Sequence, residues 1–102
     1  MKLTSVKHHL HHISHLETYG NYMYVHFIDS PRILYARTLS YSLNQLPGFL
    51  RVHRHYAITP RLAQAVEVDT TAAWVLVANH KLPISRRSSR LVLGTLTNQG
   101  LP

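Results

Sequence analysis

Apolar and polar residues alternate along much of this chain, and a period of two is typical of half-buried β-strands. The clearest alternation covers residues 22–28, where Met23, Val25 and Phe27 form one row of side chains and the remaining residues form the other. Similar segments predict further strands over Ile13–Glu17, Ile33–Arg37, Phe49–Tyr56, Ala65–Val68, Trp74–Ala78 and Leu82–Ile84. We therefore expect a domain dominated by short β-strands.

Residues that favour tight turns separate several of these segments. Gly20-Asn21 tolerates positive φ angles, Asp29–Arg32 contains a proline, and Asn79–Lys81 begins with another asparagine. Each of these segments lies between two predicted strands. We therefore expect three hairpins with antiparallel pairing.

The period changes twice, each time after a residue suited to capping a helix. Thr38 precedes Leu39, Leu43 and Leu46, which share one helical face, and Pro47-Gly48 then ends the pattern. Ser85 similarly precedes a short final helix expected over Arg86–Leu96. The 102 residues suffice for one domain, which we place at 13–96 between a basic, histidine-rich lead-in (1–12) and a polar tail (97–102).

The charge balance limits the partners that this domain can have. Eleven Lys and Arg residues face four Asp and Glu, giving a net charge of +7 and favouring a polyanion such as nucleic acid. The chain has no cysteine, no apolar run long enough to span a bilayer and no signal peptide, so we expect a cytoplasmic protein without disulfides or membrane contact. We expect neither a cofactor nor catalysis, since no Gly-rich phosphate loop or carboxylate pair is present.

The segment Phe49–Tyr56, F-L-R-V-H-R-H-Y, concentrates basic residues within one predicted strand. Arg51 and His53 fall on the row with Phe49, which we expect to face the interior. There Arg51 would pair with Glu17 or Glu67, and His53 would hydrogen-bond to the backbone. The basic end of the strand would then be presented to a phosphate backbone.

Four motifs in the right order resemble the LytTR family of bacterial DNA-binding domains. They are Leu16–Tyr22 (L-E-T-Y-G-N-Y), Arg37–Pro47 (R-T-L with the later leucines), Phe49–Tyr56 (family pattern F-x-R-[VI]-H-[RK]-S-[YF]) and Leu82–Arg87 (family pattern L-P-V-S-R-R). The resemblance covers roughly Ile13–Leu96. It implies a mainly β, elongated fold of short antiparallel sheets with one short internal helix and a C-terminal helical turn. His55 stands where the family usually has serine, which changes the local contact chemistry.

The resemblance also implies binding of double-stranded DNA through loops, as the output domain of a two-component response regulator. We expect Arg54 and Arg86 to read bases, supported by the turn Asn21-Tyr22-Met23. Candidates for contacts with the DNA backbone are His55, Ser85, Arg87, Lys81 and Arg90. Paired half-sites, a dimer on DNA and a separate sensor or receiver protein are further implied partners.

Three other interpretations of these residues remain open. Tyr19, Tyr22 and Tyr24 with the basic charge would also suit a domain that binds RNA or single strands. A protein-interaction module that has lost DNA binding is the second. The third is a metal site, because several N-terminal histidines have helical i, i+4 spacing, but we expect none in the absence of an acidic ligand nearby. These histidines are His8, His9, His11, His12 and His15.

Overall fold

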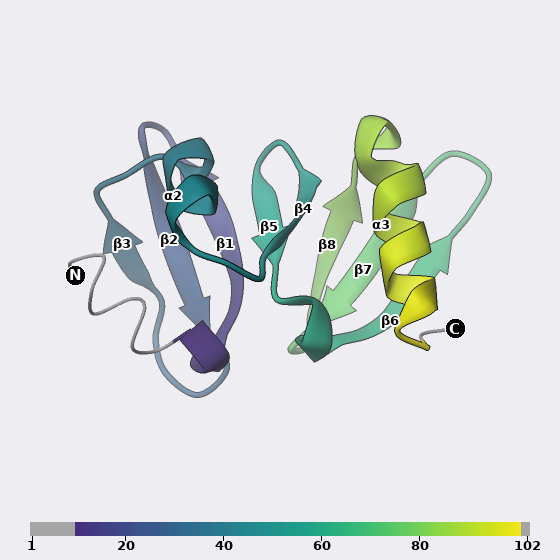
Figure 1. Cartoon of the computed structure of the whole chain (residues 1–102), viewed down its shortest axis with the longest axis horizontal. Helices are drawn as coiled ribbons and strands as arrows, with labels where there is room; N and C mark the ends of the chain where they lie inside the picture. The colour runs from purple at the N-terminus through teal and green to yellow at the C-terminus, as the bar shows by residue number, and fades with distance from the viewer. Residues whose placement is uncertain (1–9, 101–102) are drawn as a thin grey trace.

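The computed structural model describes residues 10–100 and shows two antiparallel sheets side by side along an axis of 40 Å, with shorter axes of 24 and 21 Å (Figure 1). The five-stranded sheet has the order β3-β2-β1-β5-β4, and the three-stranded sheet has the order β6-β7-β8. The first consists of β1 (Ile13–Tyr19), β2 (Tyr22–Phe27), β3 (Ile33–Tyr35), β4 (Leu50–His53) and β5 (Tyr56–Ile58). The second consists of β6 (Ala63–Val68), β7 (Ala73–Val77) and β8 (His80–Ile84). The predicted mainly β, elongated fold is confirmed.

Two α-helices and two short 3₁₀ helices complete the described chain. Helix α2 is Leu39–Gln45, α3 is Arg86–Asn98, η1 is Leu10–His12 and η2 is Pro60–Leu62. Both predicted caps are confirmed, because the backbone N–H of Tyr41 donates to Thr38 Oγ1 at 3.1 Å and that of Ser88 donates to Ser85 Oγ at 3.2 Å. Helix α3 confirms the helix expected over Arg86–Leu96 and continues two residues further, so it is longer than a helical turn.

The segment Phe49–Tyr56 is not the single strand that its alternation predicted. Leu50–His53 forms β4, Arg54-His55 forms a turn, and β5 returns from Tyr56 as a hairpin. Strand β5 lies between β4 and β1, so Ala57 pairs with both Arg51 and Leu16. Alternation missed this turn because neither Gly, Pro nor Asn marks it, and because the register of the hairpin shifts between Arg51 and His53.

The remaining hairpins form where turn residues predicted them, with one shift. Gly20 has a φ of +58°, which suits the β1–β2 turn. The β7–β8 turn lies one residue earlier than expected, at Ala78 and Asn79, which have φ angles of 47° and 67°. Pro83 is tolerated in β8 because that strand lies at an edge of its sheet.

The apolar side chains form two separate cores. The first lies between the larger sheet and α2 and includes Leu16, Met23 and Val25. The second joins the β4–β5 hairpin to the smaller sheet and α3, and includes Val52, Ile58 and Leu96. The hairpin therefore contributes to both cores, since Ala57 belongs to the first and Ile58 to the second.

Truncation of a buried side chain on α3 should test the second core. Leu96 is fully buried, so Leu96→Ala should lower the free energy of unfolding by about 2–5 kcal/mol. Leu91 lies on the same helix and is 67% exposed, so Leu91→Ala should change it by less than about 0.5 kcal/mol. Urea unfolding followed by circular dichroism measures both. Equal losses for the two variants would contradict the observed packing of α3.

Candidate nucleic-acid interface

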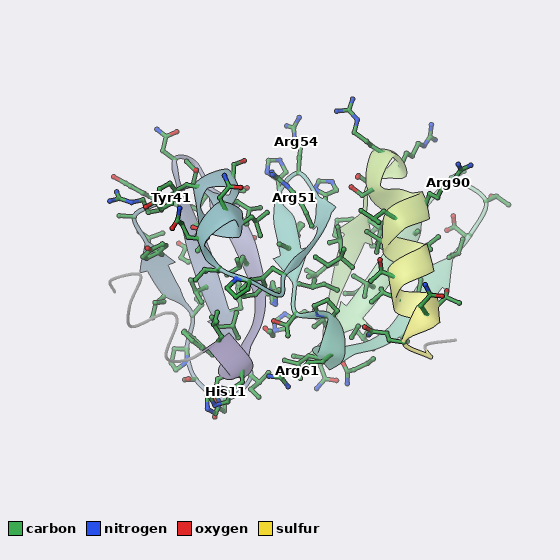
Figure 2. All side chains as sticks on the ribbon, viewed as in Figure 1. His11, Tyr41, Arg51, Arg54, Arg61 and Arg90 are labelled. Carbon is green, nitrogen blue, oxygen red and sulfur yellow. The ribbon has the colours of Figure 1, made fainter. Side chains whose placement is uncertain are left out.

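Three segments far apart in the sequence meet along one long edge of the molecule. Strand β1 runs toward this edge and β2 leaves it, so the β1–β2 turn lies there, as do the β4–β5 turn and the start of α3 (Figure 1). Figure 2 shows the Arg54 side chain projecting from the same edge, with His11 and Arg61 at the opposite one. We call the edge formed by these three segments the three-turn edge.

The β4–β5 turn is held from its own strand and from helix α2. Arg51 Nη2 donates to the carbonyl oxygen of Arg54 at 2.8 Å, and Arg51 Nη1 donates to Ser40 Oγ at 3.2 Å. The expected pairing of Arg51 with Glu17 or Glu67 is therefore wrong. The guanidinium of Arg51 binds the carbonyl oxygen of the turn instead, and both carboxylates have other partners. Glu17 contacts His26, and Glu67 contacts Lys81.

Two histidines flank Arg54 within this turn. The backbone N–H of His55 donates to His53 Nδ1 at 3.2 Å, which confirms that His53 bonds to the backbone. Partial burial, then His55 and then Arg54 lower the pKa of His53 below its usual value. Arg54 Nε in turn donates to His55 Nε2 at 3.1 Å. The turn therefore presents an arginine whose direction is set by neighbouring side chains.

A basic pocket of about 540 Å³ lies between the β4–β5 turn and the start of α3. Its lining consists of Arg51, His53, Arg54, Ser85, Arg87 and Ser88. The backbone N–H of Ser85 donates to the carbonyl oxygen of Val52 at 2.8 Å, which fixes the helix start against β4. Cationic side chains and the N–H groups of a helix start suit a phosphate oxygen. Sequence reasoning placed Arg51 and His53 toward the interior and missed that both are half-buried in the wall of this pocket. It also missed Ser88, although the i+3 spacing from the Ser85 cap could have indicated it.

The two predicted arginines at the start of α3 line different hollows. Arg87 lines the basic pocket, whereas Arg86 lines a second hollow with the β6–β7 turn around Asp69. Both side chains are exposed, and Arg90 is exposed one turn further along the helix (Figure 2). Arg86 and Arg90 are four residues apart and therefore lie on the same side of the helix, whereas Arg87 lines the basic pocket.

The predicted β1–β2 contact turn is divided between surface and core. Asn21 is exposed and Tyr22 is 47% exposed, so both are accessible at the three-turn edge. Met23 is fully buried in the first core, because alternation along β2 turns its side chain inward. Its side chain is therefore not presented at the surface. Tyr24 is half-buried, with the Arg32 guanidinium carbon 3.9 Å from the centre of its ring.

Lys81 lies apart from the other predicted site residues. It is near the start of β8, beside the β7–β8 turn and at the opposite end of that strand from Ser85. Its Nζ is 2.9 Å from Glu67 Oε2 and 5.1 Å from the centre of the Trp74 ring. Lys81 therefore contacts Glu67 on β6 and Trp74 on β7 and does not lie at the three-turn edge.

Comparison with known proteins identifies the family. The model of the LytTr DNA-binding domain matches residues 4–96, which is most of the chain. This chain belongs to the LytTR family of DNA-binding domains. A solved structure described as the LytTr DNA-binding domain of a methyl-accepting/DNA response regulator from Bacillus cereus has the same fold, with a TM-score of 0.72 and 22% identity over 82% of this chain and 83% of that one. No curated protein matches this LytTR chain in sequence.

Three histidine rings of this LytTR domain lie close together, with His15 buried, His26 half-buried and His80 exposed. The ring of His15 stacks on that of His26 with centroids 4.1 Å apart, and the ring of His80 from the other sheet lies 4.9 Å from His15. Within residues 10–100, no group of three His, Asp or Glu side chains has the arrangement needed to hold a metal ion. His8 and His9 lie outside the described residues. None of the helices in this part of the chain is long and apolar enough to cross a membrane.

Acid should weaken the fold through His15. Burial first, then the neighbouring His26 and His80, lower the pKa of His15 from 6.5 to about 3. The unfolded chain therefore binds more protons below pH 6.5, so the stabilising contribution is complete above that pH and is lost as the pH falls toward 3. His15→Gln should flatten the decline by up to about 1.4 kcal/mol per pH unit. Urea unfolding between pH 7 and 4 measures this, and identical slopes for the two proteins would refute it.

Proposed function

We propose that this LytTR domain is a bacterial transcription regulator that binds a specific sequence in duplex DNA with its three-turn edge. The observation that carries the proposal is the convergence of Asn21, Arg54 and the start of α3 on one edge of a chain with few carboxylates. Successive major grooves on one face of a duplex are about 34–36 Å apart. The 40 Å long axis of the domain is sufficient to reach two of them.

The residues of the edge have different roles in this proposal. Arg54 and Arg86 read guanine through paired hydrogen bonds to O6 and N7, and Asn21 and Tyr22 add contacts from the β1–β2 turn. Ser85, Arg87 and Arg90 contact the DNA backbone, whereas both ring nitrogens of His55 are bonded within the protein. We leave out Lys81 and the side chain of Met23, because the first lies apart from the edge and the second is buried.

The assembly and its setting are part of the same proposal. The domain acts in the cytoplasm as an output module, and its input arrives from a sensor or receiver protein. Two copies occupy paired half-sites on DNA. What supports this is membership of the LytTR family.

In vitro selection of random duplex DNA at 50 and 150 mM salt tests the proposed function. Enrichment of a repeated half-site would support it. Retention that vanishes at the higher salt without enrichment would reduce the domain to a basic surface without specificity. Preferential capture of single strands would instead favour base stacking on the exposed Tyr19 and Tyr22.

Single arginine substitutions should distinguish residues that recognise a base from residues that only attract the DNA backbone. Arg86→Ala should cost about 1–3 kcal/mol on the selected site and relax preference at one base position. Arg90→Ala should weaken all duplexes alike. Arg61→Ala is the matched control, since it removes the same charge at the opposite edge (Figure 2). Fluorescence anisotropy with selected and scrambled duplexes measures all three, and unchanged discrimination by Arg86→Ala would remove Arg86 from the reading role.

Salt should weaken binding steeply if the edge neutralises phosphates. With roughly 6–10 phosphate contacts per complex, affinity should fall by about 10³–10⁵ between 50 and 200 mM salt because bound counterions are released. The slope of log affinity against log salt, measured by anisotropy on the selected duplex, gives the number of contacts. A flat dependence would favour a protein partner over DNA.

A further inference from the structure

His55 bridges two segments of the three-turn edge through both nitrogens of its ring. Arg54 Nε donates to His55 Nε2 at 3.1 Å, and His55 Nδ1 lies 2.6 Å from Thr18 Oγ1. Because Nε2 accepts a hydrogen bond from Arg54, the hydrogen of a neutral imidazole must reside on Nδ1, which then donates to Thr18. One neutral tautomer therefore satisfies both contacts, whereas a protonated ring has no acceptor for Arg54.

The partner of His55 is part of the neighbouring contact segment. Thr18 lies in β1, two residues before the Gly20-Asn21 turn, and its backbone N–H also donates to the carbonyl oxygen of His55 at 2.9 Å. Thr18 thus holds both the backbone and the ring of His55. On the other side of the turn, Arg51 holds the carbonyl oxygen of Arg54. The backbone around Arg54 is therefore fixed from both sides. Only the orientation of the Arg54 side chain remains to be set by a further contact.

We propose that His55 is a positioning residue that aims the Arg54 guanidinium from the β4–β5 turn and thereby determines the base preference of this domain. The inference rests on the proposed function, in which Arg54 reads a base. The hydrogen bond to Nε uses the inner nitrogen of Arg54 and leaves the two terminal nitrogens for the paired contact with guanine. The serine usual in the LytTR signature is too short to span Thr18 and Arg54 in this way.

No acidic side chain in the described part of the chain pairs with His55. Arg54 and His53 of its own hairpin face it directly, Arg51 donates to the carbonyl oxygen of Arg54, and Arg87 lines the adjoining pocket. Thr18 on β1 is uncharged. Glu17, the neighbour of Thr18, is bonded to His26 at 2.9 Å. Within residues 10–100 no carboxylate forms an ion pair with His55, and the hydrogen bonds of its ring go to Arg54 and Thr18.

The test compares the full chain with His55→Ser, His55→Gln, Thr18→Val and Arg54→Ala. The probes are the duplex selected from a random pool and a variant of it changed at the base pair whose preference Arg54→Ala relaxes. Anisotropy at pH 7.5 gives the ratio of the affinities for these two duplexes. Thermal unfolding of each variant confirms that it is folded.

At pH 7.5, His55→Ser and Thr18→Val should each lower the ratio of affinities for the selected and the altered duplex about tenfold. Their ratios should then approach that of Arg54→Ala. His55→Gln should preserve it, because the amide oxygen accepts from Arg54 and the amide nitrogen donates to Thr18. The comparison of His55→Ser with His55→Gln separates the loss of the bridge from the loss of the imidazole ring itself.

The outcomes separate this inference from the proposed function. If Arg54→Ala lowers the ratio but His55→Ser and Thr18→Val do not, His55 has no positioning role, while the proposed reading by Arg54 stands. If Arg54→Ala leaves discrimination unchanged at every base pair, or if no sequence is enriched in the selection, both proposals are overturned.

Discussion

The position of β5 between β1 and β4 is the constraint on which the rest of this structure depends. Its two neighbouring residues Ala57 and Ile58 face opposite sides of the sheet and enter different cores. Strand β4 lies next to β5 at the edge of the sheet. Its residue Val52 packs in the second core, and the carbonyl oxygen of Val52 accepts a hydrogen bond from the backbone N–H of Ser85. Two small cores that would each be marginal alone are thereby joined through one hairpin.

The same hairpin determines where basic side chains can meet. Its turn has to emerge beside the end of β1, because β5 pairs with β1, and beside the start of α3, because Ser85 is bonded to β4. Arg54 is therefore placed between Thr18 and Arg87 by strand pairing and does not depend on attraction between charges, all of which are positive here. Mutual repulsion among these cations is unfavourable in the free protein and is relieved when a polyanion binds.

Histidines act in two distinct environments of this domain. His15 is nearly excluded from water between the two sheets, where burial keeps it neutral and makes the fold sensitive to acid. His53 and His55 lie at the surface, where each accepts or donates single hydrogen bonds around Arg54. The first environment therefore connects a histidine to the stability of the fold, and the second connects two histidines to the orientation of Arg54.

The sequence by itself determined the local elements: strands from a period of two, helix starts from Thr38 and Ser85, and the LytTR family from four short motifs. Each of these signals depends only on residues that are close together in the sequence, so it can be recognised without knowledge of the tertiary structure. The turn at Arg54, the burial of Met23, the partners of Arg51 and the separation of Lys81 from the edge were decided only by the tertiary structure. Each depends on which strands pair and in which register, and contacts such as Thr18 with His55, 37 residues apart, exist only once the two strands lie side by side.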